Sequence, residues 1–194
     1  MNLNAKRSLA ALLLTSLSAP SYATTSEQNA FFTELAQHCG NAYAGKVVAD
    51  NSSDSSFRGK RLVMHVRECS DNQLKVPFHV GEDHSRTWVI SKTDYGLHLA
   101  HDHRHQDGSE DKVTQYGGMT ATLGSASKQS FPADARSINN FRDNGLDVSV
   151  TNVWHLALTP TTFRYQLTRD NRNFEVEFDL SQPVPLPPTP WGHQ

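Results

Sequence analysis

Several features are scarce in this 194-residue sequence, and each scarcity excludes a class of protein. The longest uninterrupted apolar run, residues 9–14, is far shorter than the roughly 20 residues that cross a bilayer, so we expect no stable membrane insertion. The formal net charge is only −2, from 18 basic and 20 acidic residues. Without a basic excess, the chain is not expected to bind nucleic acid or to attach to a membrane through a polybasic patch.

Catalytic signatures are also missing. The chain contains no Gly-x-Ser-x-Gly turn, no phosphate-binding loop, no His-Glu-x-x-His and no Cys-x-x-Cys. The sequence therefore assigns no catalytic residue, and it leaves open whether the protein is an enzyme.

The first 23 residues have the three parts of a cleavable signal peptide. Lys6 and Arg7 precede the short apolar run, and the small residues Ser21 and Ala23 fit the positions before a cleavage site. We therefore expect a protein that is exported to the periplasm or secreted. Residues 24–182 are expected to form one domain, and residues 183–194 a proline-rich tail.

Only two cysteines are present, Cys39 and Cys69. In an oxidising compartment two cysteines most simply form one disulfide bond. Since the loop between them is about 30 residues long, the bond should stabilise the fold by roughly 3–4 kcal/mol.

The hydrophobic pattern has a period of two along most of the chain. About ten strand-like runs lie between residues 43 and 180, including 95–105 and 147–158, and short turn signals separate most of them. A short helix is expected over 26–38 and another near 133–144. One apolar face per strand and short connections favour an antiparallel up-and-down β-barrel, with a two-sheet β-sandwich as the alternative.

The sequence carries two resemblances, one that bears on export and one that bears on the fold. The run 97–118, together with Cys39-Gly40, Lys60-Arg61-Leu62 and Phe178-Asp179-Leu180, resembles a family of secreted bacterial proteins of uncharacterised activity. That resemblance implies export and no particular reaction. A weaker likeness is to the lipocalin-like (calycin) barrels, in which an N-terminal helix leads into a first strand marked by glycine, as Gly40 and Gly45 would mark it here.

Side chains that can bind a metal or transfer a proton are concentrated in one histidine-rich segment, which holds His98, His101, His103 and His105. If the strand alternates regularly, His101, His103 and His105 point into the barrel mouth after Leu97 and Leu99, whereas His98, Asp102 and Arg104 point outward. With a fourth ligand from Asp107, or alternatively from Glu110 or Asp111, the side chains of His101, His103 and His105 would suit a transition metal such as zinc. Three further interpretations stay open: a hydrogen-bonded rim, acid–base catalysis without a metal, and a ligand site.

The ligand interpretation is that the barrel holds a small molecule near its mouth. The residues expected to contact it are Trp88, His101, His103 and Tyr116. Tyr116 is followed by Gly117 and Gly118, a pair that favours a β-bulge. This interpretation requires an interior cavity, because a small barrel filled by its own side chains has no room for a ligand.

The end of the chain is unlike the rest. Five prolines lie between residues 183 and 190, which excludes a central strand and predicts an extended segment. The segment is expected either to pack on the barrel wall through Trp191 or to dock into a partner as an envelope interaction protein would.

Overall fold

The chain forms a nearly closed antiparallel β-barrel with two helices, which confirms the fold predicted from the sequence. The computed structural model describes residues 25–53 and 55–193, so the expected signal peptide, residues 1–23, lies outside the described residues. In chain order the elements are α1 (Ser26–Ala36), β1 (Ala42–Asp50), β2 (Leu62–His65), β3 (Glu68–Cys69), β4 (Gln73–Val80), β5 (Asp83–Thr93), β6 (Gly96–His103), β7 (Tyr116–Met119), β8 (Lys128–Pro132), α2 (Ala135–Asp143), the 3-10 helix η1 (Asp147–Ser149), β9 (Val153–Leu158), β10 (Thr162–Arg169) and β11 (Arg172–Val184).

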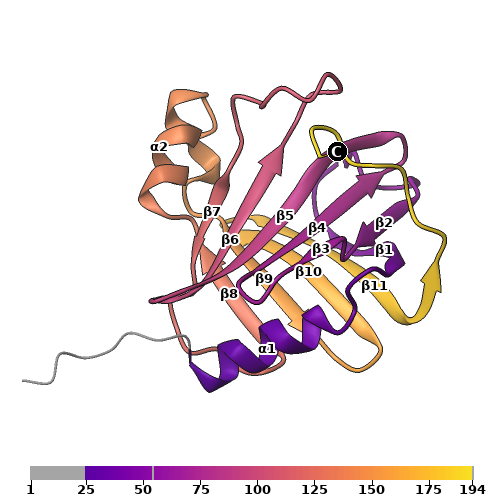
Figure 1. Cartoon of the computed structure of the whole chain (residues 1–194). Coiled ribbons are helices and arrows are strands. Elements are labelled where there is room, and N and C mark those ends of the chain that lie inside the picture. Colours follow the sequence, from indigo (N-terminus) through magenta and orange to yellow (C-terminus); the bar gives the residue numbers. More distant parts are fainter. Residues whose placement is uncertain (1–24, 54, 194) are drawn as a thin grey trace, which may run out of the picture.

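One continuous sheet makes the barrel. Its strands lie in the order β7-β6-β5-β4-β2-β1-β11-β10-β9-β8, with β3 beside β4. The sheet curls until its end strands, β7 and β8, are in contact (Figure 1). The chain therefore does not adopt the sandwich alternative, in which two separate sheets would pack face to face.

The contact between β7 and β8 is closed by a short network instead of a strand ladder. The backbone N–H of Asp134 donates to the carbonyl of Gly117 at 2.9 Å. The buried hydroxyl of Ser137, at the start of α2, accepts from the Gly117 N–H at 2.7 Å and donates to the Gly117 carbonyl at 2.9 Å. The Ser137 side chain thus satisfies backbone groups of Gly117 that would be unpaired in the absence of a strand ladder between β7 and β8.

Gly118 allows this close approach to β8, and Gly117 allows a similar approach to β6. The register between β6 and β7 runs without a shift, so the expected bulge at Gly117 and Gly118 is absent. A Cβ atom on Gly118 would lie 2.0 Å from the carbonyl oxygen of Pro132, and one on Gly117 would lie 1.8 Å from that of Leu99. No side chain fits here, because the neighbouring backbones occupy the space that it would need.

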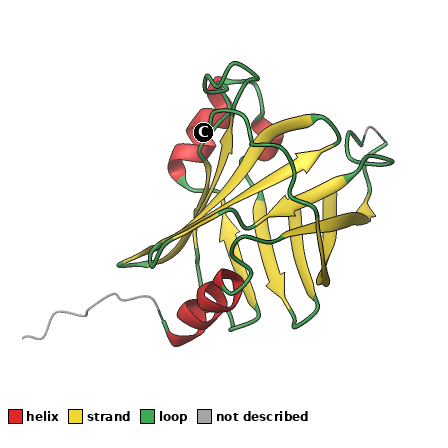
Figure 2. Cartoon of the chain, turned by 45° about the vertical axis from the view of Figure 1, so that its right-hand side comes forward, coloured by secondary structure: helices red, strands yellow, loops and turns green. Residues whose placement is uncertain are grey.

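The helix α1 covers one end of the barrel, and α2 lies at the other end (Figures 1 and 2). Thr25 and Gln28 form a capping box that begins α1. The apolar side of α1 then buries Phe31, Phe32 and Leu35 in the core. Cys39 follows α1 and forms a disulfide bond with Cys69 of β3, which confirms the predicted pair.

Two of the expected boundaries that differ in the structure are the start of a late strand and the start of the tail. The strand expected over 147–158 begins only at Val153, because the 3-10 helix η1 occupies its first residues and leaves Val148 69% exposed. At the other boundary, β11 continues to Val184, two residues into the expected tail. Pro183 can pair with Tyr43 there, since a register irregularity between Tyr43 and Gly45 lets the strand accommodate a residue without an N–H.

The rest of the proline-rich tail packs on the outer wall of the barrel. The backbone N–H of Trp191 donates to the carbonyl of His84 at 3.0 Å. His193 Nε2 lies 2.9 Å from Asp102 Oδ2. Asp102 points outward as strand alternation predicted, yet it is only 2% exposed because the tail covers it.

Candidate ligand-binding pocket

A cavity of about 390 Å³ opens at the end of the barrel opposite α1. Strand ends, α2, η1 and the loops before β2 and β7 all contribute side chains to its wall. The far end of the barrel is filled by packed side chains, among them Phe163, Phe178 and the α1 residues. The barrel is therefore a solid core at one end and a hollow at the other, and the hollow has the volume of a small-molecule site.

The four residues that were expected to contact a ligand all line this cavity. Trp88 comes from β5, His101 and His103 come from β6, and Tyr116 begins β7. They meet because these three strands are neighbours in the sheet and the residues share the inward face. Their contact with a ligand remains a prediction.

His101 is held by two hydrogen bonds that fix its tautomer. Its Nδ1 lies 3.0 Å from the carbonyl oxygen of Tyr116, which can only accept, so Nδ1 carries the proton. Its Nε2 lies 2.8 Å from the Tyr165 hydroxyl and, in the neutral ring, accepts from it. His101 thereby orients the Tyr165 hydroxyl, whose oxygen keeps its capacity to accept a further hydrogen bond.

Burial keeps the histidines of the pocket neutral. Burial, with a smaller effect from His103, lowers the pKa of His101 to about 3. Burial and the nearby Arg86 charge lower the pKa of His103 to about 4, and burial raises the pKa of Tyr116 to about 12. Since neither nitrogen of His101 is free, we interpret this residue as one that positions its tyrosine neighbours and not as a proton shuttle.

Aromatic rings form most of the cavity wall. Trp88 stacks on Tyr165 with ring centroids 4.5 Å apart and an angle of 15° between the planes. His101 stacks on Tyr116 at 4.7 Å and 12°. Phe57, Phe78, Phe141, Trp154 and Phe174 extend this lining. Such a surface suits a flat apolar body, which gains dispersion and quadrupole contacts from parallel rings.

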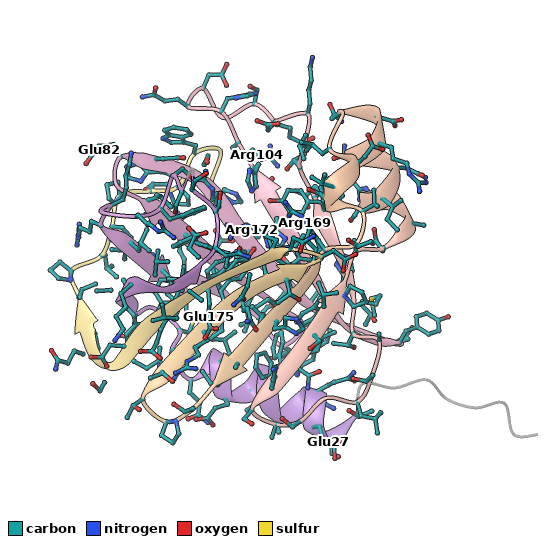
Figure 3. All side chains as sticks on the ribbon, turned by 180° about the vertical axis from the view of Figure 1, so that it is seen from behind. Glu27, Glu82, Arg104, Arg169, Arg172 and Glu175 are labelled. Carbon is teal, nitrogen blue, oxygen red and sulfur yellow. A yellow bond between two sulfur atoms is a disulfide. The ribbon has the colours of Figure 1, made fainter. Side chains whose placement is uncertain are left out.

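Three arginines provide the positive charge of the wall. Arg86 is paired with Asp83 at 2.5 Å, and Arg172 is paired with the buried carboxylate of Asp50 at 2.7 Å. Arg169 donates to the side-chain oxygen of Asn152 at 3.1 Å. Figure 3 shows Arg169 and Arg172 next to each other, where β10 meets β11.

The structure does not bring together the four residues of the expected metal site. His105 and Asp107 are exposed and lie beyond the end of β6, where the alternation that would have aimed His105 inward has stopped. Asp107 instead accepts hydrogen bonds from the backbone and hydroxyl of Ser109. Across residues 25–53 and 55–193, no group of three or more histidine, cysteine or acidic side chains is placed to hold a metal ion.

Several residues of this wall were not predicted from the sequence to be part of the site, notably Arg86, Trp154, Tyr165 and Arg169. A signal for them was present. Arg86 has the same parity as Trp88, and Arg169 has the same parity as Tyr165, so each is a charged residue at the end of an inward-facing apolar series. Such a charge marks the place where a barrel interior changes from core to mouth.

The neutral His101 makes stability depend on pH. Below pH 6.5 the unfolded chain gains a proton at this position, whereas the folded chain gains it only near pH 3. Stability is therefore lost as the pH falls, by about 1.4 kcal/mol per pH unit for this one group. Urea unfolding measures the free energy of unfolding at each pH. Between pH 6 and 4.5, we expect this free energy to fall less steeply in His101→Phe than in the wild type, by about 1.4 kcal/mol per pH unit.

The matched control for this prediction is Leu99→Ala. Leu99 lies two residues before His101 on the same face of β6 and is fully buried. The control should have a lower free energy of unfolding at every pH, but the slope of that free energy against pH should equal the slope of the wild type. Equal slopes for His101→Phe and the wild type would contradict a neutral His101.

Comparisons with known proteins add no constraint on this site. No family model, curated protein or solved structure matches the chain. Among the described residues, no helix is both long and apolar enough to cross a membrane.

Proposed function

We propose that this protein is an exported binding protein that holds a small, largely apolar molecule in the open end of its barrel. The observation that carries the proposal is the cavity of about 390 Å³ with its wall of aromatic rings. Ligand pockets in proteins usually measure about 300–1,000 Å³ and combine an apolar wall with a few polar groups that fix orientation. This cavity has both properties, and its volume favours a compact molecule over a long lipid chain.

The polar groups of the pocket support binding more than catalysis. His101 is neutral and has both nitrogens engaged, and Arg86 and Arg172 are occupied by carboxylates. These bonds hold the wall in one arrangement before any ligand arrives. A preorganised wall favours affinity, since little side-chain entropy remains to be lost on binding.

Export is part of the same proposal. The charged, apolar and small-residue segments of residues 1–23 fit a signal peptide, and the Cys39–Cys69 disulfide is compatible with an oxidising compartment. A binding protein in that setting would meet its ligand outside the cytoplasm.

A substitution that fills the cavity tests the proposal. Leu167 lines the cavity from β10, and Gln166, the preceding residue, is on the outer face of the same strand. We expect Leu167→Trp to weaken the binding of the neutral fluorescent probe N-phenyl-1-naphthylamine by at least about tenfold, since the larger ring occupies the space that the probe needs. Gln166→Trp should leave binding unchanged.

Native mass spectrometry of protein from its own host gives the second readout. The wild type is expected to carry a bound small molecule that is absent from Leu167→Trp. If the wild type binds no probe and carries no molecule, or if the two tryptophan variants behave alike, the protein is not a binding protein of this kind.

A further inference from the structure

Two arginines face each other across the hairpin at the pocket mouth. Arg169 is the last residue of β10 and Arg172 is the first residue of β11, and the two are directly paired in the ladder. Both line the cavity. Like charges placed directly opposite on one face of a sheet repel each other, so this arrangement costs stability unless an anion lies between or beside them.

The protein itself supplies only part of the compensating charge. Arg172 contacts the carboxylate of Asp50, whose side chain is only 1% exposed. For Arg169, the described part of the chain provides a neutral partner, the amide of Asn152, and no ion pair with a carboxylate. A guanidinium has five N–H donors, and Arg169 uses one of them in this bond.

The remaining charged groups of the wall lie with other partners. Arg86 is paired with Asp83, and Asp111 accepts a hydrogen bond from the backbone of Val113. Arg86 is paired with His103 in the ladder between β5 and β6, and the backbone N–H of Asp111 donates to the carbonyl of His103 at 3.0 Å, so both groups lie on the side of the pocket near β6. Within the described residues, the side formed by β10 and β11 therefore keeps one uncompensated positive charge, at Arg169.

We propose that the pocket takes a small aromatic carboxylate, whose acid group binds Arg169 and whose ring packs on the aromatic wall. This inference rests on the proposed binding function and names the class of ligand. The stacked pair of Trp88 and Tyr165 offers the surface on which the ligand ring would pack. Arg169 accounts for the acid, since a guanidinium binds a carboxylate through two parallel N–H bonds.

The test compares two probes of one shape, 2-naphthoate and the neutral 2-naphthamide, by quenching of tryptophan fluorescence. In the wild type, we expect the acid to bind at least about tenfold more tightly than the amide, because a hydrogen bond to a charged group is worth more than one to a neutral group. Arg169→Gln should remove this preference by weakening the acid and leaving the amide unchanged. Arg169→Lys keeps the positive charge but loses the planar guanidinium that forms two parallel N–H bonds. This variant should therefore retain part of the preference for the acid.

Arg164→Gln is the matched control. Arg164 is on the same strand but on its outer face, where it pairs with Glu177. It should keep the full preference for the acid. Thermal unfolding of each variant shows whether it is folded before binding is measured, and Arg169→Lys provides the test if Arg169→Gln does not fold.

The outcomes separate this inference from the binding function itself. If the amide binds as tightly as the acid, or if the preference survives in Arg169→Gln, the anion site is refuted while the pocket stands. If N-phenyl-1-naphthylamine binds but neither 2-naphthoate nor 2-naphthamide does, the proposal of an aromatic acid is likewise refuted, and the binding function is not. A preference lost equally in Arg164→Gln would show a general charge effect and would also refute the site.

Discussion

Replacing Gly118 by alanine is expected to lower the free energy of unfolding by about 3 kcal/mol or more, which in a chain of this size corresponds to a loss of roughly 6–12 °C in Tm. The new Cβ atom would lie 2.0 Å from the carbonyl oxygen of Pro132. That oxygen belongs to the backbone of β8 and cannot rotate away as the end of a side chain would. The barrel must therefore open between β7 and β8 to accept the methyl group.

Opening the barrel at this contact would also disturb the pocket. The network between Gly117, Asp134 and Ser137 would be lost, since these hydrogen bonds span the same contact. Tyr116 precedes the two glycines, and α2 follows β8, so both sides of the pocket would move. We expect Gly118→Ala to bind N-phenyl-1-naphthylamine more weakly as well as to unfold at lower denaturant concentration.

Met119→Ala is the control for Gly118→Ala. Met119 is the next residue of β7, and its side chain is only half-buried. Removing it should cost less than about 1 kcal/mol, because little packing is lost at a half-buried position. If Gly118→Ala were no less stable than Met119→Ala, the close approach of β7 and β8 would be wrong.

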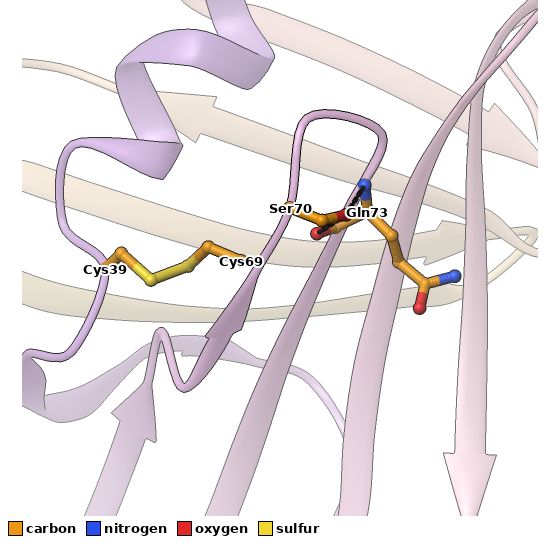
Figure 4. Close-up of a disulfide and its surroundings, with 4 residues drawn as sticks. All are labelled: Cys39, Cys69, Ser70 and Gln73. Carbon is orange, nitrogen blue, oxygen red and sulfur yellow. Dashed lines mark hydrogen bonds between the residues drawn. A yellow bond between two sulfur atoms is a disulfide. The ribbon is translucent and has the colours of Figure 1, made fainter.

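Removing the disulfide bond is expected to have an effect of similar size. The bond closes a loop with a sequence separation of 30 residues between Cys39 and Cys69 (Figure 4). Restricting that loop in the unfolded chain stabilises the fold by about 3–4 kcal/mol in the chain-entropy description. We expect the double variant Cys39→Ala/Cys69→Ala to lose that amount in urea unfolding, and reduction of the wild type to produce the same loss.

The disulfide variant should nevertheless keep its pocket. The bond joins the segment after α1 to β3, and α1 covers the end of the barrel opposite the cavity. Probe affinity should therefore remain within about twofold under conditions in which the variant is folded. A loss of less than about 1 kcal/mol in stability would contradict the entropic role of the bond, and a lost pocket would contradict its remote position.

The sequence alone determined the fold class, the number of strands to within one and the disulfide pair. The disulfide follows from the presence of only two cysteines. The fold class follows from local patterns, because the alternation of Leu97, Leu99 and His101 dictates which side chains of β6 point into the barrel wherever the strand lies. The same alternation directed Trp88, His101 and His103 to the inner face, where the structure has them. It failed where a strand is shorter than the pattern, because β6 ends before His105 and β9 begins only after Val148.

Only the tertiary structure decided how the barrel closes and which charge at its mouth lacks a partner among the described residues. Gly117 and Gly118 look like any flexible pair in the sequence. Gly118 is required because the backbone of residues 132–134 approaches it, and Gly117 because the backbone of Leu99 does. Arg169 and Arg172 differ because Asp50, which lies 122 residues before Arg172, pairs with that arginine and leaves Arg169 with an amide. Periodicity reports the face on which a residue lies, but the partner it meets across that face depends on how distant strands are brought together.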